Sequence, residues 1–181
     1  MKKANRATSA RTPAKQFADF LAKYDPQIGR LVRTARAKLR KRMPGAIELV
    51  YDNYNALAIG FGPSERASEA VVSLAVYPRW VNLYFLRGAT LPDPERLLRG
   101  SGSQGRYTVL ESADDIDRPG IHALLEAALT TSTRPLQATP RGYIVNKSMS
   151  AKQRPRRPGT KKDSHNRRLQ PTPGAIATGR G

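Results

Sequence analysis

The sequence of 181 residues contains no cysteine, a single tryptophan and only 7% aromatic residues. The lack of cysteine excludes disulfide bonds, thiolate catalysis, and zinc or iron–sulfur sites built on thiolates. No apolar run approaches the roughly 20 residues that a transmembrane helix needs, and no signal-peptide segment follows the basic start. We therefore expect a cytoplasmic protein without a membrane span.

Acidic residues are also scarce, because 14 Asp and Glu stand against 32 Lys and Arg, giving a net charge of +18. Residues 17–130 are nearly neutral, and the surplus lies at the two ends of the chain. Residues 132–181 are rich in proline, glycine and basic residues, a composition that buries too little apolar surface to offset the entropy of ordering. We predict a basic disordered arm over 1–12, one domain over 13–131 and a basic disordered tail over 132–181.

The spacing of apolar residues within 13–131 predicts both helices and strands. Thr12-Pro13 and Asp25-Pro26 are cap-plus-proline signals that begin helices. Helical spacing predicts helices over 13–24, 26–43, 93–98 and 121–128, and alternation predicts strands over 47–51, 57–61, 72–76, 80–86 and 106–110. Ser112 and Asp115 have the spacing of a capping box.

This order of elements predicts an α+β fold of two layers. The links between the first four strands are short, which favours antiparallel hairpins over parallel crossovers. We expect an antiparallel sheet of about five strands, with the N-terminal and C-terminal helices packed on one face.

The same stretch, from about Phe17 to Leu129, resembles the YdhG-like family of small bacterial domains. The residues that carry the resemblance are Met43-Pro44-Gly45-Ala46 before Glu48, Tyr77-Pro78, Leu83-Tyr84, the run 97–102 and the run 114–119. The resemblance implies a compact α+β domain with a frataxin-like character. Some relatives are described as intracellular iron chaperones, which implies iron handling as a candidate role, whereas the two tails have no counterpart in the family.

Polar residues cluster near the two expected hairpins and form a candidate ligand pocket at the rim or open face of the sheet. They are Glu48, Tyr51, Asp52, Tyr54, Asn55, Arg79, Asn82, Tyr84 and Arg87. The alternative is the ordinary polar face of an antiparallel sheet.

Residues 100–105 match the pattern G-x-G-x-x-G, but a predicted helix precedes them and a strand follows, the reverse of a dinucleotide-binding context. We expect a flexible connection. The alternative is a simple anion site on backbone amides and arginines, with Arg99, Gly100, Ser101, Gly102 and Arg106 as its residues.

The expected helix over 26–43 carries seven basic residues and no acidic one. Its candidate polyanion-binding residues, mostly opposite the apolar stripe, are Arg30, Arg33, Arg36, Arg40 and Lys41. Such a surface suits nucleic acid, anionic lipid or an acidic protein. The alternative is a solvated helix back.

Asp114, Asp115 and Asp117 cluster at an expected helix start and are the candidate metal ligands, as carboxylate oxygens suit hard cations and iron. Acidic residues are equally expected at a helix start, so the sequence predicts no cofactor beyond a weak iron site. No nucleophile–base motif stands out.

We therefore predict a non-enzymatic binding or chaperone-type module for an unidentified protein or small ligand, with iron handling implied by the resemblance. The alternatives are non-specific nucleic-acid binding through the basic helix and the tails, and small-molecule or anion binding at the sheet rim and the loop 100–105.

Overall fold

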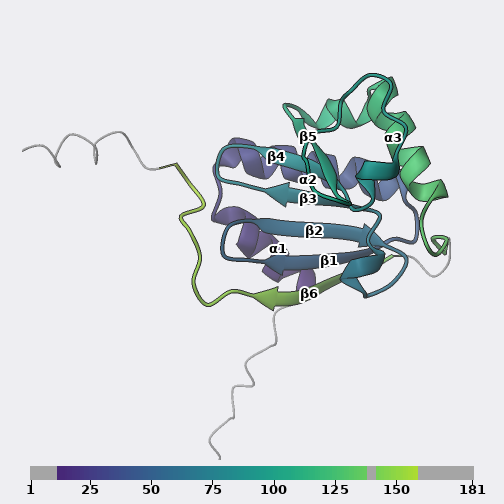
Figure 1. The fold of residues 1–181 in the computed structure, drawn as a ribbon. Helices are drawn as coiled ribbons and strands as arrows, with labels where there is room; N and C mark the ends of the chain where they lie inside the picture. The colour runs from purple at the N-terminus through teal and green to yellow at the C-terminus, as the bar shows by residue number, and fades with distance from the viewer. Residues whose placement is uncertain (1–11, 138–141, 159–181) are drawn as a thin grey trace, which may run out of the picture.

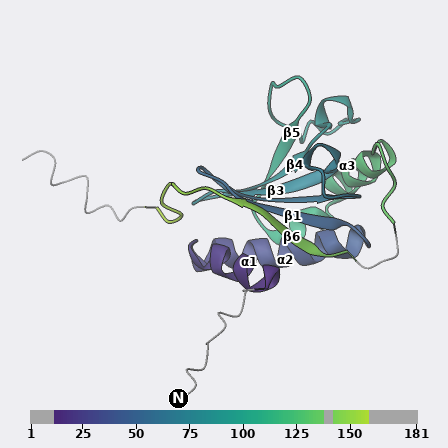
Figure 2. The same cartoon turned by 90° about the horizontal axis from the view of Figure 1, so that it is seen from below.

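The computed structural model describes residues 12–137 and 142–158. Of the expected arm over 1–12, residues 1–11 lie outside the described residues, as do residues 138–141 and 159–181 of the expected tail. The described chain is an α+β structure, in which a six-stranded sheet has α1 (Pro13–Ala22) and α2 (Pro26–Arg42) behind one face (Figure 1). Turned by 90°, the two helices lie together on one side of the sheet (Figure 2).

Both N-terminal helices begin where their caps predict. The Thr12 side chain accepts a hydrogen bond from the Lys15 amide at 3.3 Å, and Asp25 accepts one from the Gln27 amide at 2.8 Å. Each cap satisfies a backbone amide that the first helical turn leaves unpaired. The apolar stripes then turn toward the sheet, where Phe17, Phe20, Leu21, Val32, Ala35 and Leu39 are buried.

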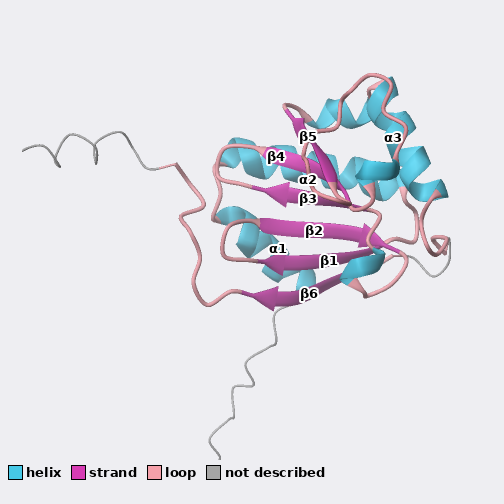
Figure 3. Ribbon diagram, in the orientation of Figure 1, coloured by secondary structure: helices cyan, strands magenta, loops and turns pink. Residues whose placement is uncertain are grey.

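The first five strands form antiparallel pairs in the order β5-β4-β3-β2-β1. Their bounds are β1 Ile47–Asp52, β2 Leu57–Gly62, β3 Val72–Val76, β4 Val81–Phe85 and β5 Arg106–Leu110. Short 3₁₀ helices lie between them at η1 (Ala67–Glu69) and η2 (Gly88–Thr90). Figure 3 shows these strands side by side, with hairpin turns at their ends.

A sixth strand corrects two predictions. β6 (Ile144–Met149) pairs with β1 in parallel, so the sheet is mixed rather than wholly antiparallel, and it has six strands rather than five. Part of the segment expected to be a disordered tail therefore belongs to the fold. The composition of 132–181 concealed this strand because the apolar pair Ile144-Val145 is short and sits among basic and small residues.

The expected helix over 93–98 is also wrong, because the structure has turns there. The Asp93 carboxylate accepts hydrogen bonds from the amides of Leu97 and Leu98, both at 2.8 Å, and Arg96 has a φ of 53°. Asp93 therefore closes a local loop instead of starting a helix. The capping box of Ser112 and Asp115 is confirmed, and it begins η3 (Ala113–Asp117) ahead of α3 (Pro119–Thr130).

The hydrophobic core lies between the sheet and the helices. Alternate residues of the central strands point into it, including Ile59, Phe61, Leu74 and Leu83, and none of these four is exposed. The apolar stripe of α3 joins the same core through Ile121, Leu124, Leu125 and Ala128. Across the described residues, no helix combines the length and apolarity needed to cross a bilayer.

Candidate functional site

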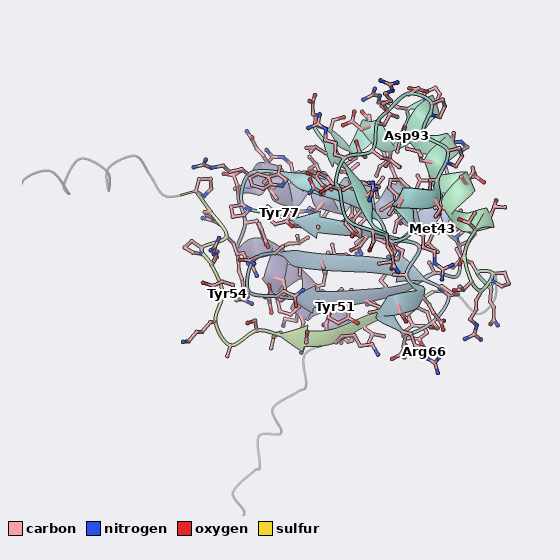
Figure 4. The ribbon with its side chains drawn as sticks, in the orientation of Figure 1. Met43, Tyr51, Tyr54, Arg66, Tyr77 and Asp93 are labelled. Carbon is pink, nitrogen blue, oxygen red and sulfur yellow. The ribbon has the colours of Figure 1, made fainter. Side chains whose placement is uncertain are left out.

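A groove lies where the β1–β2 and β3–β4 hairpins turn, and its volume is about 580 Å³. We call it the hairpin groove, and we call residues 150–158, which follow β6, the strap. The residues that line the groove come from three distant parts of the chain: Asn55, Tyr77, Pro78, Arg79, Trp80, Arg154, Pro155, Arg157 and Pro158. Tyr54 and Tyr77 mark this end of the molecule in Figure 4.

Two aromatic rings of the groove are stacked on each other. The centroids of Tyr77 and Trp80 lie 5.1 Å apart with an interplanar angle of 23°, and the Tyr77 amide donates to the Trp80 carbonyl oxygen at 2.9 Å. Trp80 is still 45% exposed, so the stack presents a flat apolar surface to solvent. At the same end of the molecule (Figure 4), Tyr54 is 47% exposed, with the Arg154 guanidinium 5.6 Å from its ring centroid.

Three arginines, Arg79, Arg154 and Arg157, line the same groove as the Tyr77–Trp80 stack. Arg157 donates to the backbone oxygens of Tyr24 and Ala22, both at 3.2 Å, which fixes its position at the C-terminal end of α1. Within the described chain, no carboxylate forms an ion pair with Arg79, Arg154 or Arg157. The groove therefore combines uncompensated positive charge with exposed rings.

Only two of the nine pocket residues predicted from the sequence, Asn55 and Arg79, line the hairpin groove, and a third, Tyr54, contacts Arg154 of its lining. Glu48 and Asp52 are buried on the helix side of β1. The Glu48 carboxylate lies 2.5 Å from Arg36 Nε and 3.2 Å from Arg40 Nε. These two acids hold the layers together rather than line a pocket.

The remaining candidates lie elsewhere. Tyr51, Asn82 and Tyr84 fall on the sheet face opposite the helices, because along β1 and β4 they alternate with the residues that face the helices. Asn82 Oδ1 is buried without a hydrogen-bond partner among the described residues. Arg87 is near the C-terminal end of α3, where it lines a small cavity with Leu91.

The loop 100–105 presents carbonyl oxygens rather than amides to Arg106, which does not suit an anion site there. The Arg106 guanidinium donates to the carbonyl oxygens of Gly102 and Gly105, so the loop wraps carbonyls around a cation. The Arg99 backbone pairs with Tyr107 in both directions. Gly100 has a φ of 109°, a turn conformation that glycine adopts freely, and Ser101 and Gly102 are exposed.

The basic face of α2 is partly neutralised by contacts inside the protein. Arg36 and Arg40 are bound to Glu48, while Lys38 binds Asp114 and Asp117, and Arg42 binds Asp117 at 2.6 Å. Of the five predicted polyanion-binding residues, Arg30, Arg33 and Lys41 have no ion-pair partner in the described part of the chain.

The three candidate metal ligands do not converge on one point. The Asp115 carboxylate accepts hydrogen bonds from the amides of Glu111 and Ser112. Asp114 and Asp117 form ion pairs with Lys38 of α2. Over residues 12–137 and 142–158, no group of three or more potential metal ligands is present.

The contacts of Asp117 predict an acid-sensitive link between η3 and α2. Hydrogen bonds from Lys38 and then Arg42 hold the pKa of Asp117 below its ordinary value of 3.8. A lowered folded-state pKa gives stability that is present above the ordinary value and is lost as the pH falls through the folded-state value. In thermal unfolding between about pH 2 and pH 6, Asp117→Asn should therefore lose less stability on acidification than the wild type.

Glu111→Gln, the same change from acid to amide at an exposed position, is the matched control and should keep the acid dependence of the wild type. Parallel acid limbs for the wild type and Asp117→Asn would contradict the link.

Sequence reasoning missed the central residues of the hairpin groove. Trp80 follows a turn and resembles an ordinary first strand residue, and the segment from Arg154 to Pro158 resembles a disordered arm. The available signal was the concentration of three arginines within 154–157, which has no acidic neighbour to neutralise it.

Comparisons with family models, with curated proteins and with solved structures found no match to this chain. A functional proposal must therefore rest on the residues that line the groove.

Proposed function

We propose that this chain is a non-enzymatic cytoplasmic binding module whose ligand is single-stranded nucleic acid, held in the hairpin groove. The observation that carries the proposal is the exposed Tyr77–Trp80 stack in a groove that is also lined by Arg79, Arg154 and Arg157, none of them paired with a carboxylate in the described chain. The net charge of +18 favours encounter with any polyanion.

Single-stranded nucleic acid fits this chemistry better than a simple anion does. An unpaired base offers a flat face for stacking on an exposed ring, and its neighbouring phosphates offer charge to guanidinium groups. Stacking on aromatic side chains contributes about 1–3 kcal/mol per base. In a duplex the base faces are already stacked, so the rings of the groove have nothing to contact.

The other roles predicted from the sequence draw less support. Iron handling, implied by the resemblance to the YdhG-like family, remains a prediction, and the acids that would serve it are bound by cations or backbone amides. Polyanion binding by α2 is reduced to Arg30, Arg33 and Lys41, because its other cations are paired. Each site therefore has three cations without an ion-pair partner in the described chain, but only the groove combines them with an exposed aromatic stack.

Trp80→Ala is expected to weaken binding of a labelled oligothymidylate about tenfold or more, because it removes the outer ring of the stack. A loss of about 1.4 kcal/mol corresponds to a tenfold change in affinity, which falls within the range for one stacked base. The measurement is a fluorescence anisotropy titration, with a duplex of equal length for comparison.

Tyr143→Ala is the matched control for loss of an exposed ring. Tyr143 is 47% exposed, as Tyr54 is, but its hydroxyl donates to Glu65 and it lies outside the groove. We expect its affinity to match the wild type. Equal losses in Trp80→Ala and Tyr143→Ala would contradict a stacking site.

Charge is tested in the same way by comparing Arg79→Ala with Arg66→Ala. Both arginines are exposed, but Arg66 lies at the opposite end of the molecule from Tyr54 and Tyr77 (Figure 4). Loss of one phosphate contact should reduce the slope of log affinity against log salt by about 0.7 in Arg79→Ala. The slope should not change in Arg66→Ala.

A chain ending at Pro158 separates the groove from the basic residues that follow it. This chain keeps β6 and the whole strap, so binding that still depends on Trp80 supports the groove. Binding that disappears on this truncation and ignores Trp80→Ala would assign the affinity to residues 159–181 and defeat the proposal.

A further inference from the structure

The strap supplies one complete wall of the hairpin groove. Arg154, Pro155, Arg157 and Pro158 line the groove from the strap, and the two hairpin turns supply the other side. The strap follows the edge of the β1–β2 turn, where the amides of Ser150 and Arg154 donate to the backbone oxygens of Asp52 and Tyr54 at 2.8 and 2.9 Å. Without the docked strap the groove would have a single wall.

One side chain anchors the strap in the interior. Arg156 is 5% exposed although its neighbours in the strap are open to solvent, and its Nη2 donates to Asp52 Oδ1 at 2.8 Å and to the Asn53 carbonyl oxygen. Its guanidinium lies 5.5 Å from the ring centroid of the buried Tyr24. Asp52 is fully buried, and its other carboxylate oxygen accepts a hydrogen bond from Lys23 Nζ at 2.7 Å.

This anchor makes docking close to all-or-none. A buried guanidinium is favourable only while a carboxylate and hydrogen-bond acceptors compensate it. Arg156 Nε and Nη1 are buried without hydrogen-bond partners among the described residues, so the contacts of Nη2 carry the compensation. Arg156 therefore either occupies its pocket beside Asp52 or leaves it for water.

We infer that Arg156 is the positioning residue of the hairpin groove, so that docking of the strap and binding of a single strand favour each other. This inference rests on the proposed function for the identity of the ligand. A ligand that contacts both walls binds only the docked form, so the apparent affinity falls with the docked fraction. By reciprocity the ligand must stabilise the docked strap.

The test is hydrogen–deuterium exchange of residues 150–158 in the full chain, combined with oligothymidylate titrations. Arg156→Met removes the anchor and leaves Asp52 paired with Lys23, so we expect the variant to fold. Without ligand its strap should exchange faster than in the wild type. Its affinity should fall at least tenfold, and saturating oligothymidylate should restore the protection of the strap.

Two matched variants separate positioning from direct contact. Lys152→Met removes the same charge at an exposed position of the strap and should change exchange and affinity less than twofold. Arg154→Met removes a groove cation and should reduce the salt slope by about 0.7. Arg156→Met should keep the wild-type slope, since it changes the docked fraction and not the phosphate contacts.

The failures can be told apart. Unchanged exchange in Arg156→Met, or an affinity within twofold of the wild type despite faster exchange, would overturn the linkage alone. A wild-type chain that binds no oligothymidylate, while Arg156→Met still frees the strap, would overturn the proposed function and the linkage with it. If Arg156→Met does not fold, Arg156→Lys keeps the charge and should show the same changes in smaller measure.

Discussion

Replacing Asp52 with alanine is expected to lower the free energy of unfolding by about 3–5 kcal/mol, the usual cost of breaking a buried ion pair by removing one partner. Asp52 is fully buried in β1, and its two carboxylate oxygens bind Lys23 and Arg156. Its removal deprives the buried Arg156 of its counter-charge, so Arg156 must either stay buried unpaired or leave its pocket together with the contacts of the strap. Urea denaturation at neutral pH measures the loss.

A double-mutant cycle identifies the cause. Asp52→Ala combined with Arg156→Met should lose less stability than the two single changes together, because the second change removes the charge that the first leaves unpaired. Asp114→Ala, whose side chain is 86% exposed, controls for loss of an acidic residue and should change the stability little. Strictly additive losses in the cycle would contradict a direct pairing of Asp52 with Arg156.

The sequence predicted the elements whose signals are local. The caps at Thr12 and Asp25 begin α1 and α2, and the alternation of residues marks the first five strands. Each of these signals lies within a few residues of the structure that it specifies, so no knowledge of the tertiary fold was needed. The resemblance to the YdhG-like family stays a prediction.

Long-range features could not be predicted in the same way. β6 pairs with the edge of β1, which lies far earlier in the chain, and the short apolar pair Ile144-Val145 does not by itself indicate a strand. The alternation of residues in β1 also did not show which side of the strand faces the helices. Glu48, Val50 and Asp52 face the helices, and the two acids are tolerated there because arginine and lysine side chains reach them.

The candidate site was hidden for the same reason. The pocket residues predicted from the sequence were chosen because they are polar and near hairpins, and that rule does not distinguish the two sides of a strand. The hairpin groove instead depends on Trp80 and on residues 154–158, and the latter follow β6, which pairs with β1. Its defining contacts join segments that are far apart in sequence.

Phe61→Ala is the second large expected loss of stability, about 3–5 kcal/mol, the usual range for truncating a buried phenylalanine. Phe61 has no exposed surface and lies in β2, between Glu48 of β1 and Val72 of β3. Trp80→Ala, which removes a larger but 45% exposed ring, should cost at most about 1 kcal/mol, the order of one stacking contact.

Comparing Phe61→Ala with Trp80→Ala separates aromatic residues that stabilise the fold from those that we assign to ligand binding. At a temperature where both variants are folded, Phe61→Ala should bind oligothymidylate as the wild type does, because Phe61 lies in the core and not in the groove. Trp80→Ala should show the opposite pattern, with near-normal urea denaturation and weak binding. A large loss of stability in Trp80→Ala would mean that the exposed stack serves the fold, and a site built on that stack would lose its main support.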